Sequence, residues 1–586
     1  MRKQMKGICS GVIHWISKNS QLFFGISILC LFSSQAYSQF SDHRKSESYA
    51  LKRQRWVDSV YQSLPLEKKI AQLYMAIAHT KSNMPHVTNL VKELGIGGIC
   101  FMQGDPAEQM TIMRALQQQA KIPLWFSMDA EWGMGMRLPN VGNLPRALTI
   151  GAANDTALAL RVGQAIGRQF RRMGIHINFA PVLDINSNPN NPVINYRSFG
   201  ENTEKVSQMA WYVIRGMQEM GVIACAKHFP GHGNTDVDSH LSLPLIKESM
   251  ENIERTDLCP YRKLIPAGLQ GVMTGHLSVP ALDATPNLPG SLSAKVVQDL
   301  LIQKMGFEGL VFTDGLNMSS VTKLYSSAAL DLRSLMAGND VLLFSKLSDQ
   351  GIDTIRRAYE KGIISEERLS RSVKKVLAAK YDVGLWENVK KDTTGIAREL
   401  NDSLPEIRKA VAEAAITCVN DEHDLIQSIR KSDIKDVTLV TFSQKQNIFE
   451  TEFGKQGLKN IVQLYLPDSN KRKQQWARIR SAAGVIVNVG GLLQSPAKNF
   501  GLDSLKLKLL QELSEMPNVC LVFFGNPYIL RNFCDVKSAL ICYDEEAETQ
   551  LAAIRVFTSA LNLKGQLPVS VCPRLKEGHT YRSPSW

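Results

Sequence analysis

The sequence lacks the motifs of several common cofactor and nucleic-acid binding classes. None of its ten cysteines shows metal spacing such as C-x-x-C. The segment VNVGG at 487–491 contains no G-x-G-x-x-G, so we predict no dinucleotide site there. The densest basic runs, KRQR at 52–55 and KRK at 471–473, are not interleaved with aromatic residues, as a groove for single-stranded nucleic acid would be. We therefore expect no cofactor, no metal and no nucleic-acid partner.

The apolar run Leu22–Phe32 is shorter than the roughly 20 residues of a membrane-spanning helix. It follows basic residues in a stretch without Asp or Glu, and it precedes Ala36-Tyr37-Ser38, a small-x-small cleavage pattern. This predicts an export signal over residues 1–38, a periplasmic location and no membrane span after removal; an uncleaved N-terminal anchor is the alternative. Removal takes four basic residues and no acidic ones, so the net charge falls from +13 to +9. The remaining charge is dispersed, which favours solvated faces.

The length of 586 residues predicts three or four domains at roughly 150 residues each, or two if one is a barrel. Hydrophobic residues make up 44% and charged residues 21%, which is typical of a globular chain and excludes a disordered or collagen-like one. A polar linker is predicted over 39–58, and apolar residues at helical spacing follow over 66–78.

From about residue 95 a pattern repeats, in which an apolar run with β-branched residues is followed by a helical stretch. The runs are IGGICFM (96–102), IPLWFSMD (122–129), INFAPVLD (177–184), VIACAKHF (222–229), GVMTGH (271–276), GLVFTD (309–314) and DVLLF (340–344). Strands joined by helical crossovers predict a parallel sheet. Over residues 59–390 the most economical closure is a (β/α)8 barrel of the TIM type, with one strand irregular or missed.

Five of these runs have a polar residue at or next to their C-terminal end: Asp129, Asp184, His228, His276 and Asp314. The carboxyl ends of barrel strands form the active-site face, so these side chains are expected around one mouth. For any single residue, an equally good interpretation is that a polar side chain marks the end of a buried strand.

After a linker at 391–405, a second alternation predicts an α/β domain with an open sheet and three layers over 406–580. Its expected strands are DVTLVTF (436–442), NIVQLYL (460–466), GVIVNVG (484–490), NVCLVFFG (518–525), ALICYD (539–544) and QLPVSV (566–571). The cysteines beyond the signal lie mostly in apolar runs and are expected to be buried free thiols, although a bridge within the group Cys520, Cys534 and Cys542 is possible.

The densest group of reactive side chains lies in KHFPGHGNTDVDSH at 227–240. Gly and Pro exclude a packed helix or strand, so the segment is predicted to form a loop after a strand. Two alternatives are a loop with incidental histidines and a metal site made of His232, Asp236, Asp238 and His240, which lacks a fixed helical ligand spacing.

This loop resembles the K-H-F-P-G-H-G…D-S-H signature of the β-N-acetylglucosaminidases of glycoside hydrolase family 3. Four further segments resemble those of the family in the same order: DAEWG with Arg137, NFAPVLD (178–184), RSFGE (197–201) and FTDGLNM (312–318). The resemblance covers about residues 60 to 390, and the second unit is similar to the accessory domain common in the family.

The resemblance implies a retaining mechanism, with Asp314 as the nucleophile and His240 as an acid/base oriented by Asp238. Retaining glycosidases use two groups about 5 to 5.5 Å apart. A histidine suits proton transfer in both directions, and Asp238 can hold its tautomer.

The family's sugar contacts fall on Asp129, Arg137, Arg197, Lys227 and His228. Trp132, Met134 and Met136 replace the more usual small or polar residues and make the rim more apolar, while His276 and Asp184 are expected to be structural.

The expected function is that of a retaining exo-β-N-acetylglucosaminidase acting on N-acetylglucosamine-containing glycans such as peptidoglycan fragments. The alternatives are a phosphorylase on the same site and a non-catalytic glycan-binding cell-wall protein.

Overall fold

The computed structural model describes residues 47–80, 82–346, 348–385, 392–442, 448–464, 469–559 and 561–582. The predicted export signal lies outside them. The compact unit Leu64–Trp586 holds both sheets, and helix α2 (Glu47–Ser63) belongs to a separate unit. Because α2 begins at Glu47, much of the predicted 39–58 linker is helical. In the described part of the chain, no helix is both long and apolar enough to cross a membrane.

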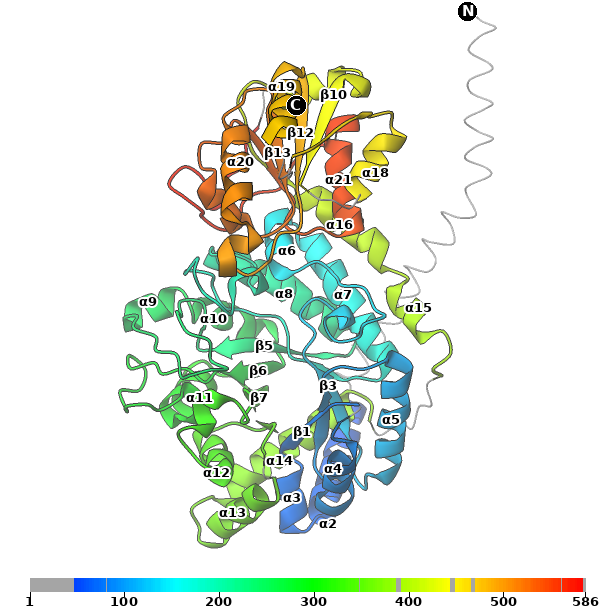
Figure 1. Cartoon of the computed structure of the whole chain (residues 1–586). Helices are drawn as coiled ribbons and strands as arrows, with labels where there is room; N and C mark the ends of the chain where they lie inside the picture. The colour runs from blue at the N-terminus through cyan, green and yellow to red at the C-terminus, as the bar shows by residue number, and fades with distance from the viewer. Residues whose placement is uncertain are drawn as a thin grey trace, which may run out of the picture. The chain divides into compact units, whose positions relative to one another are not determined.

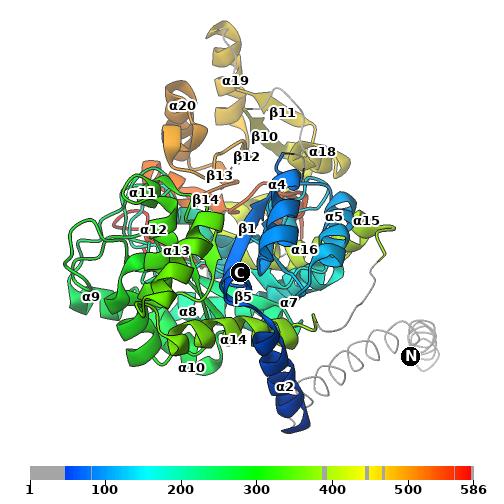
Figure 2. The ribbon, with the colours of Figure 1, turned by 90° about the horizontal axis from the view of Figure 1, so that it is seen from below.

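The first sheet has eight parallel strands in the order β7-β6-β5-β4-β3-β2-β1-β8. They are β1 (Tyr74–Ala78), β2 (Gly98–Phe101), β3 (Trp125–Met128), β4 (Ile177–Asn178), β5 (Ile223–Phe229), β6 (Gly271–Thr274), β7 (Leu310–Thr313) and β8 (Leu342–Leu343). The two ends of this order meet through a bridge between Phe312 and Val341, and Thr313 N donates to Val341 O over 3.0 Å. The sheet is therefore closed as the predicted barrel (Figures 1 and 2).

The barrel helices are α3 (Leu66–Ala71), α4 (Met84–Asn89), α5 (Pro106–Gln119), α6 (Ala147–Ala153), α7 (Thr156–Met173), α8 (Thr203–Glu219), α9 (Met250–Arg255), α10 (Cys259–Ala267), α11 (Ser319–Thr322), α12 (Ser327–Ala337), α13 (Ser348–Glu360) and α14 (Glu366–Asp382). Aromatic side chains fill the interior, where the ring of Phe312 lies 6.3 Å from that of Trp125 and 5.5 Å from that of Phe179. The barrel is thus a packed core.

Strand β1 corrects the sequence prediction. The helix expected over 66–78 ends with α3 at Ala71, and Tyr74–Ala78 is a strand between β2 and β8. Met and Ala favour helices locally, but the edges of both neighbouring strands offer backbone partners, and pairing with them overrides the local preference.

The second sheet has the order β11-β10-β12-β13-β14-β9, and only the β14–β9 pair is antiparallel. Its strands are β9 (Thr417–Asp421), β10 (Val437–Thr441), β11 (Asn460–Gln463), β12 (Gly484–Val489), β13 (Val519–Phe523) and β14 (Ser538–Ile541). Its helices are α16 (Leu404–Ala415), α17 (Leu425–Lys431), α18 (Ile448–Lys455), α19 (Ser469–Ser481), α20 (Ser504–Ser514) and α21 (Ala547–Thr558), preceded by α15 (Ile396–Asn401) within the predicted linker. Helices cover both faces of this sheet (Figure 1).

The prediction missed β9, and its strand at 566–571 is wrong. That segment is irregular and lies along the barrel, where Glu201 N donates to Pro568 O over 3.0 Å. Proline removes a donor from a strand ladder, which is consistent with a segment outside the sheet.

The bridge considered within the group Cys520, Cys534 and Cys542 is also wrong. Cys534 pairs with Cys572, while Cys520 and Cys542 are free and buried in the core of the C-terminal domain.

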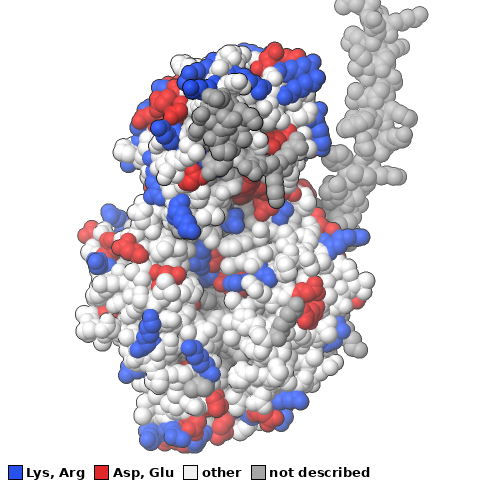
Figure 3. Space-filling view, in the orientation of Figure 1, with Lys and Arg blue, Asp and Glu red and all other residues white. Residues whose placement is uncertain are grey.

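On the face shown in Figure 3, basic and acidic side chains are interspersed.

Candidate active site

The carboxyl ends of β3, β5, β6 and β7 bring Asp129, Lys227, His276 and Asp314 to the same end of the barrel. Figure 1 shows β5, β6 and β7 side by side. Arg137 lies in the segment after β3, and Arg197 lies in the segment after β4. His228 lies in β5 itself, and Asp238 and His240 lie in the loop that follows it.

Lys227 lies at the centre of a cluster of charges. Its Nζ is 2.7 Å from Oδ1 of Asp129 and 2.8 Å from Oε1 of Glu131. Arg197 binds Glu131 through both ends of its guanidinium, with Nη2 2.7 Å from Oε1 and Nε 3.0 Å from Oε2. Arg137 donates to Oδ2 of Asp129 over 3.0 Å and to its carbonyl over 2.7 Å. Three cations share two carboxylates, so the cluster carries a net positive charge.

The ion pairs keep this cluster ionised although it is buried. Burial alone lowers the pKa of Lys227, but the charges of Asp129 and Glu131 outweigh it and raise that pKa. Burial likewise raises the pKa of Glu131, but Arg197 and Lys227 together hold it well below its ordinary value. Buried charges persist when they are paired in this way.

His228 points its Nδ1 at Oδ2 of Asp184 over 2.8 Å. The backbone amides of His228 and His232 both donate to Oδ1 of the same carboxylate, over 3.2 and 2.7 Å. Burial opposes the charge of Asp184, but these two histidines outweigh it and lower its pKa. An ionised carboxylate only accepts hydrogen bonds, so His228 donates from Nδ1 and keeps Nε2 for a ligand.

Asp314 follows β7 and is half-buried. The amide of Gly315 donates to its Oδ1 over 2.7 Å. Burial raises the pKa of Asp314, but His276, His228 and the Gly315 amide outweigh it and lower that pKa. Asp314 is therefore a carboxylate near neutral pH, as a nucleophile must be.

His276 is fully buried and supports the turn that follows Asp314. Its Nε2 lies 3.1 Å from the carbonyl of Gly315, and its Nδ1 lies 2.7 Å from the hydroxyl of Ser291. Burial lowers the pKa of His276. A carbonyl oxygen can only accept, so Nε2 of the ring donates to it. This places His276 beneath the site.

Asp238 and His240 form a pair on the loop after β5. Nδ1 of His240 lies 2.8 Å from Oδ1 of Asp238, which also accepts from the His240 amide over 2.8 Å. Burial opposes the charge of Asp238, but the hydrogen bonds from His240 and its charge outweigh it and lower the pKa of Asp238. The His240 side chain is 65% exposed, and no hydrogen bond joins it to Asp314 among the residues that the structure describes. Its charge nevertheless contributes to the lowered pKa of Asp314.

The loop itself is anchored by His232, which is buried. Its ring nitrogens lie 2.8 Å from the hydroxyl of Thr235 and 3.1 Å from that of Ser239, and burial lowers its pKa to about 4. His232 thus anchors the loop. In the described ranges, no group of three or more His, Cys, Asp or Glu is arranged to hold a metal ion.

Glu131 was not among the residues predicted from the sequence, although the segment that contains it was. Glu131 lies two residues after Asp129 beyond the end of β3, and this spacing could have indicated that both carboxylates reach the mouth.

The expected apolar rim needs correction, because Met134 is fully buried. Trp132 is half-buried and packs against Tyr196, with ring centroids 6.1 Å apart. The Arg146 guanidinium lies over both rings, at 5.2 and 5.4 Å.

Comparisons with known proteins match this architecture. Residues 65–379 match the model of the glycosyl hydrolase family 3 N-terminal domain. A β-N-acetylglucosaminidase/β-glucosidase of Cellulomonas fimi is 30% identical over 385 residues, which are 64% of this chain and 68% of that protein. The β-hexosaminidase A of Pseudoalteromonas piscicida is 31% identical over 371 residues, 58% of this chain and 62% of that protein.

One solved structure is similar over most of both chains. It is a glycoside hydrolase family 3 β-N-acetylglucosaminidase from Paenibacillus sp. str. FPU-7, with 29% identity and a TM-score of 0.73. The similarity covers 87% of this chain and 99% of that one. It therefore includes both the barrel and the α/β domain.

Proposed function

The chain belongs to glycoside hydrolase family 3, and we propose that it releases terminal β-linked N-acetylglucosamine with retention of configuration. The observation that carries the proposal is the arrangement of three groups at one end of the barrel. These are the ionised Asp314, the Asp238–His240 pair and the cluster around Lys227. The relatives named for activity on N-acetylglucosaminides or hexosaminides support the choice of sugar.

In the first step Asp314 attacks the anomeric carbon, and the bond to the glycosidic oxygen breaks. His240 gives its Nε2 proton to the departing oxygen, while Asp238 accepts from Nδ1 and stabilises the ring. The product of this step is a covalent glycosyl–Asp314 ester, as in other retaining glycosidases.

In the second step the neutral His240 takes a proton from water, which attacks the same carbon and releases Asp314. The exposure of His240 suits this step, because water reaches the ring directly. Lys227, Arg197 and Asp129 orient the sugar through its hydroxyl and acetamido groups, which lowers the entropic cost of reaching the attacking geometry.

The proposed source of substrate is a set of peptidoglycan fragments outside the cytoplasm. The export signal expected at 1–38 and the net charge of +9 after its removal support an enzyme that works near an anionic envelope.

A phosphorylase is the second candidate, and the identity of the acid/base favours it. A neutral His240 repels an incoming phosphate less than a carboxylate would. Assays with and without phosphate distinguish the two, because hydrolysis yields the free sugar and phosphorolysis yields the sugar 1-phosphate.

The mechanism is tested with a 4-nitrophenyl N-acetyl-β-glucosaminide and the variants Asp314→Ala and His240→Ala. We expect Asp314→Ala to lose at least about 10³-fold in kcat, since it lacks the nucleophile. His240→Ala keeps a burst of nitrophenolate, because this leaving group needs no protonation, and then turns over slowly. His423→Ala, at an exposed histidine in the C-terminal domain, is the control. Unchanged activity in Asp314→Ala contradicts the mechanism.

A further inference from the structure

The loop that carries Arg197 is held at both ends by the C-terminal part of the chain. We call residues 194–202 the Arg197 loop. At its start, the side-chain amide of Asn526, which follows β13, donates to the side-chain oxygen of Asn195. At its end, Glu201 contacts residues near the C-terminus. The contact that Arg197 makes with Glu131 therefore lies between two points of attachment.

The contact at Glu201 involves backbone and side chain together. The amide of Glu201 donates to Pro568 O over 3.0 Å, and its two carboxylate oxygens accept from Ser570, from the amide over 2.9 Å and from the hydroxyl over 2.5 Å. Gly200, whose φ is +148°, lies so close that a Cβ there would be 2.4 Å from Pro568 O. The approach of the two segments thus requires glycine at this position.

Residues 566–577, which we call the strap, make further contacts with the barrel. The amide of Gln566 donates to Ala152 O over 3.0 Å, and Lys205 lies 2.7 Å from Glu577 and 3.1 Å from the side chain of Gln566. The amide of Glu577 also donates to the Ser570 hydroxyl over 3.0 Å, so the strap folds back at the point where it meets Glu201.

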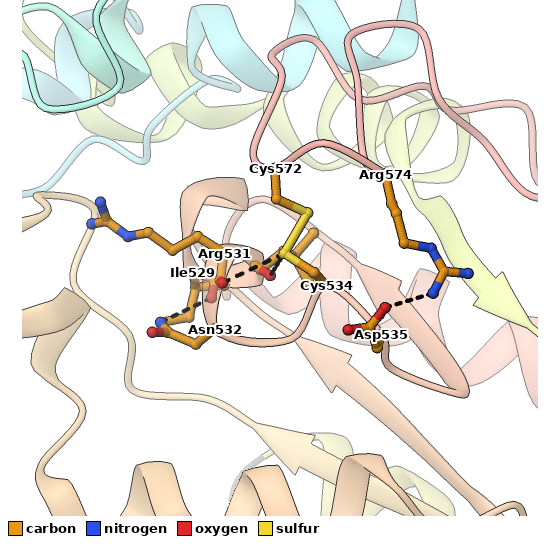
Figure 4. Close-up of a disulfide and its surroundings, with 8 residues drawn as sticks. Ile529, Arg531, Asn532, Cys534, Asp535, Cys572 and Arg574 are labelled. Atoms are coloured by element: carbon orange, nitrogen blue, oxygen red, sulfur yellow. Dashed lines mark hydrogen bonds and ion pairs between the residues drawn. A yellow bond between two sulfur atoms is a disulfide. The ribbon is translucent and has the colours of Figure 1, made fainter.

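The strap is joined covalently to the C-terminal domain. Cys572, two residues after Ser570, is bonded to Cys534, with Cα atoms 6.5 Å apart (Figure 4). Beside it Arg574 pairs with Asp535 over 2.5 Å. Both cysteines are half-exposed, so a dithiol can reach the bond.

We propose that the strap and Glu201 are a positioning device for Arg197, kept in place by the Cys534–Cys572 disulfide. The inference rests on the proposed function, because Arg197 is taken there as a sugar-orienting group. A dithiol reductant would convert the disulfide into two thiols and itself become a disulfide. The freed strap would then hold the Arg197 loop less firmly and weaken sugar binding, while Asp314 and His240 keep their places.

The test uses the full-length protein and two measurements. The first is hydrolysis of the 4-nitrophenyl N-acetyl-β-glucosaminide by Cys572→Ser, Ser570→Ala and Glu201→Ala, and by the wild type treated with dithiothreitol. We expect KM to rise about tenfold with kcat within about twofold, the pattern of lost uniform binding. Glu201→Gln keeps one side-chain acceptor for Ser570 and should show a smaller rise. Arg574→Ala, which removes only the neighbouring exposed ion pair, is the matched control.

The second measurement is hydrogen–deuterium exchange in peptides that cover residues 194–202, which needs no activity. Exchange should be faster in Cys572→Ser and Ser570→Ala than in Arg574→Ala. Unchanged exchange and an unchanged KM in Cys572→Ser, Ser570→Ala and Glu201→Ala would overturn the proposal. A wild type that does not hydrolyse the substrate would refute the proposed function instead, and exchange alone would then decide about the strap.

Discussion

Lys380 in α14 is a buried cation whose effect on stability can be predicted. Its side chain is fully buried, and its Nζ donates to Oε1 of Gln72 over 2.7 Å and lies 5.8 Å from the centre of the Trp125 ring. A neutral acceptor and an aromatic face compensate a buried ammonium only in part. Burial therefore lowers the pKa of Lys380 to about 7, from an ordinary value near 10.5.

This lowered pKa makes stability depend on pH with a definite sign. Between pH 7 and about 10.5 the unfolded chain holds the Lys380 proton more often than the folded protein does, so the free energy of unfolding rises with pH. At roughly 1.4 kcal/mol per unit, the contribution of this group changes by about 3 kcal/mol between pH 7.5 and 9.5.

Lys380→Met removes this pH dependence. It also leaves Oε1 of Gln72 without its donor, which lowers the free energy of unfolding by about 1 to 3 kcal/mol. We expect the variant to approach or exceed the wild type in stability near pH 7 and to fall below it near pH 9.5. Urea unfolding at four pH values from 7 to 10 measures the difference, with Lys361→Met at an exposed position as the control. Parallel pH profiles for Lys380→Met and the wild type would refute the reasoning.

Three further outcomes are expected. Glu131→Gln should raise KM at least about tenfold in steady-state assays and lower the unfolding free energy by about 3 kcal/mol, because it leaves two buried cations with one carboxylate fewer. Asp238→Asn should lower kcat about 10²-fold in the same assays, with unchanged thermal unfolding, because the ring of His240 loses its charged acceptor. Asp331 is buried, and burial raises its pKa to about 7. Between pH 4 and 7 the folded protein therefore holds this proton more often than the unfolded chain does, so the free energy of unfolding falls as the pH rises. Asp331→Asn should flatten this pH profile in urea unfolding.

Much of the barrel could be predicted because its apolar runs alternate with helical stretches along the chain. Tyr74–Ala78 and Thr417–Asp421 were missed for a common reason. Each is a short segment that becomes a strand through its neighbours, β2 and β8 in one case and β14 in the other. The run at 566–571 shows the converse, since its apolar residues are buried against the barrel without joining a sheet. The sequence pattern indicates which segments are buried, but strand pairing depends on neighbouring strands that come from other parts of the chain.

The candidate site could likewise be predicted only in part from the sequence. The loop at 227–240 indicated Lys227, His228 and the Asp238–His240 pair, since these reactive side chains lie close together in the sequence. The partners of Lys227 and Arg197 come from the segment that follows β3, 98 and 66 residues away, and only the folded chain reveals that Glu131 binds both. Cys534 and Cys572 are likewise 38 residues apart and meet only through the strap.

The two halves of the site differ in how far they are organised before substrate arrives. On one side, Lys227 and Glu131 are almost fully buried, Arg197 is half-buried, and all three are already paired. Binding a sugar therefore requires little rearrangement of charge. On the other side, His240 is largely exposed and is held mainly through Asp238. This difference suits the reaction, because the sugar must stay in one place through both steps. The acid/base group must instead meet first the leaving oxygen and then a water molecule.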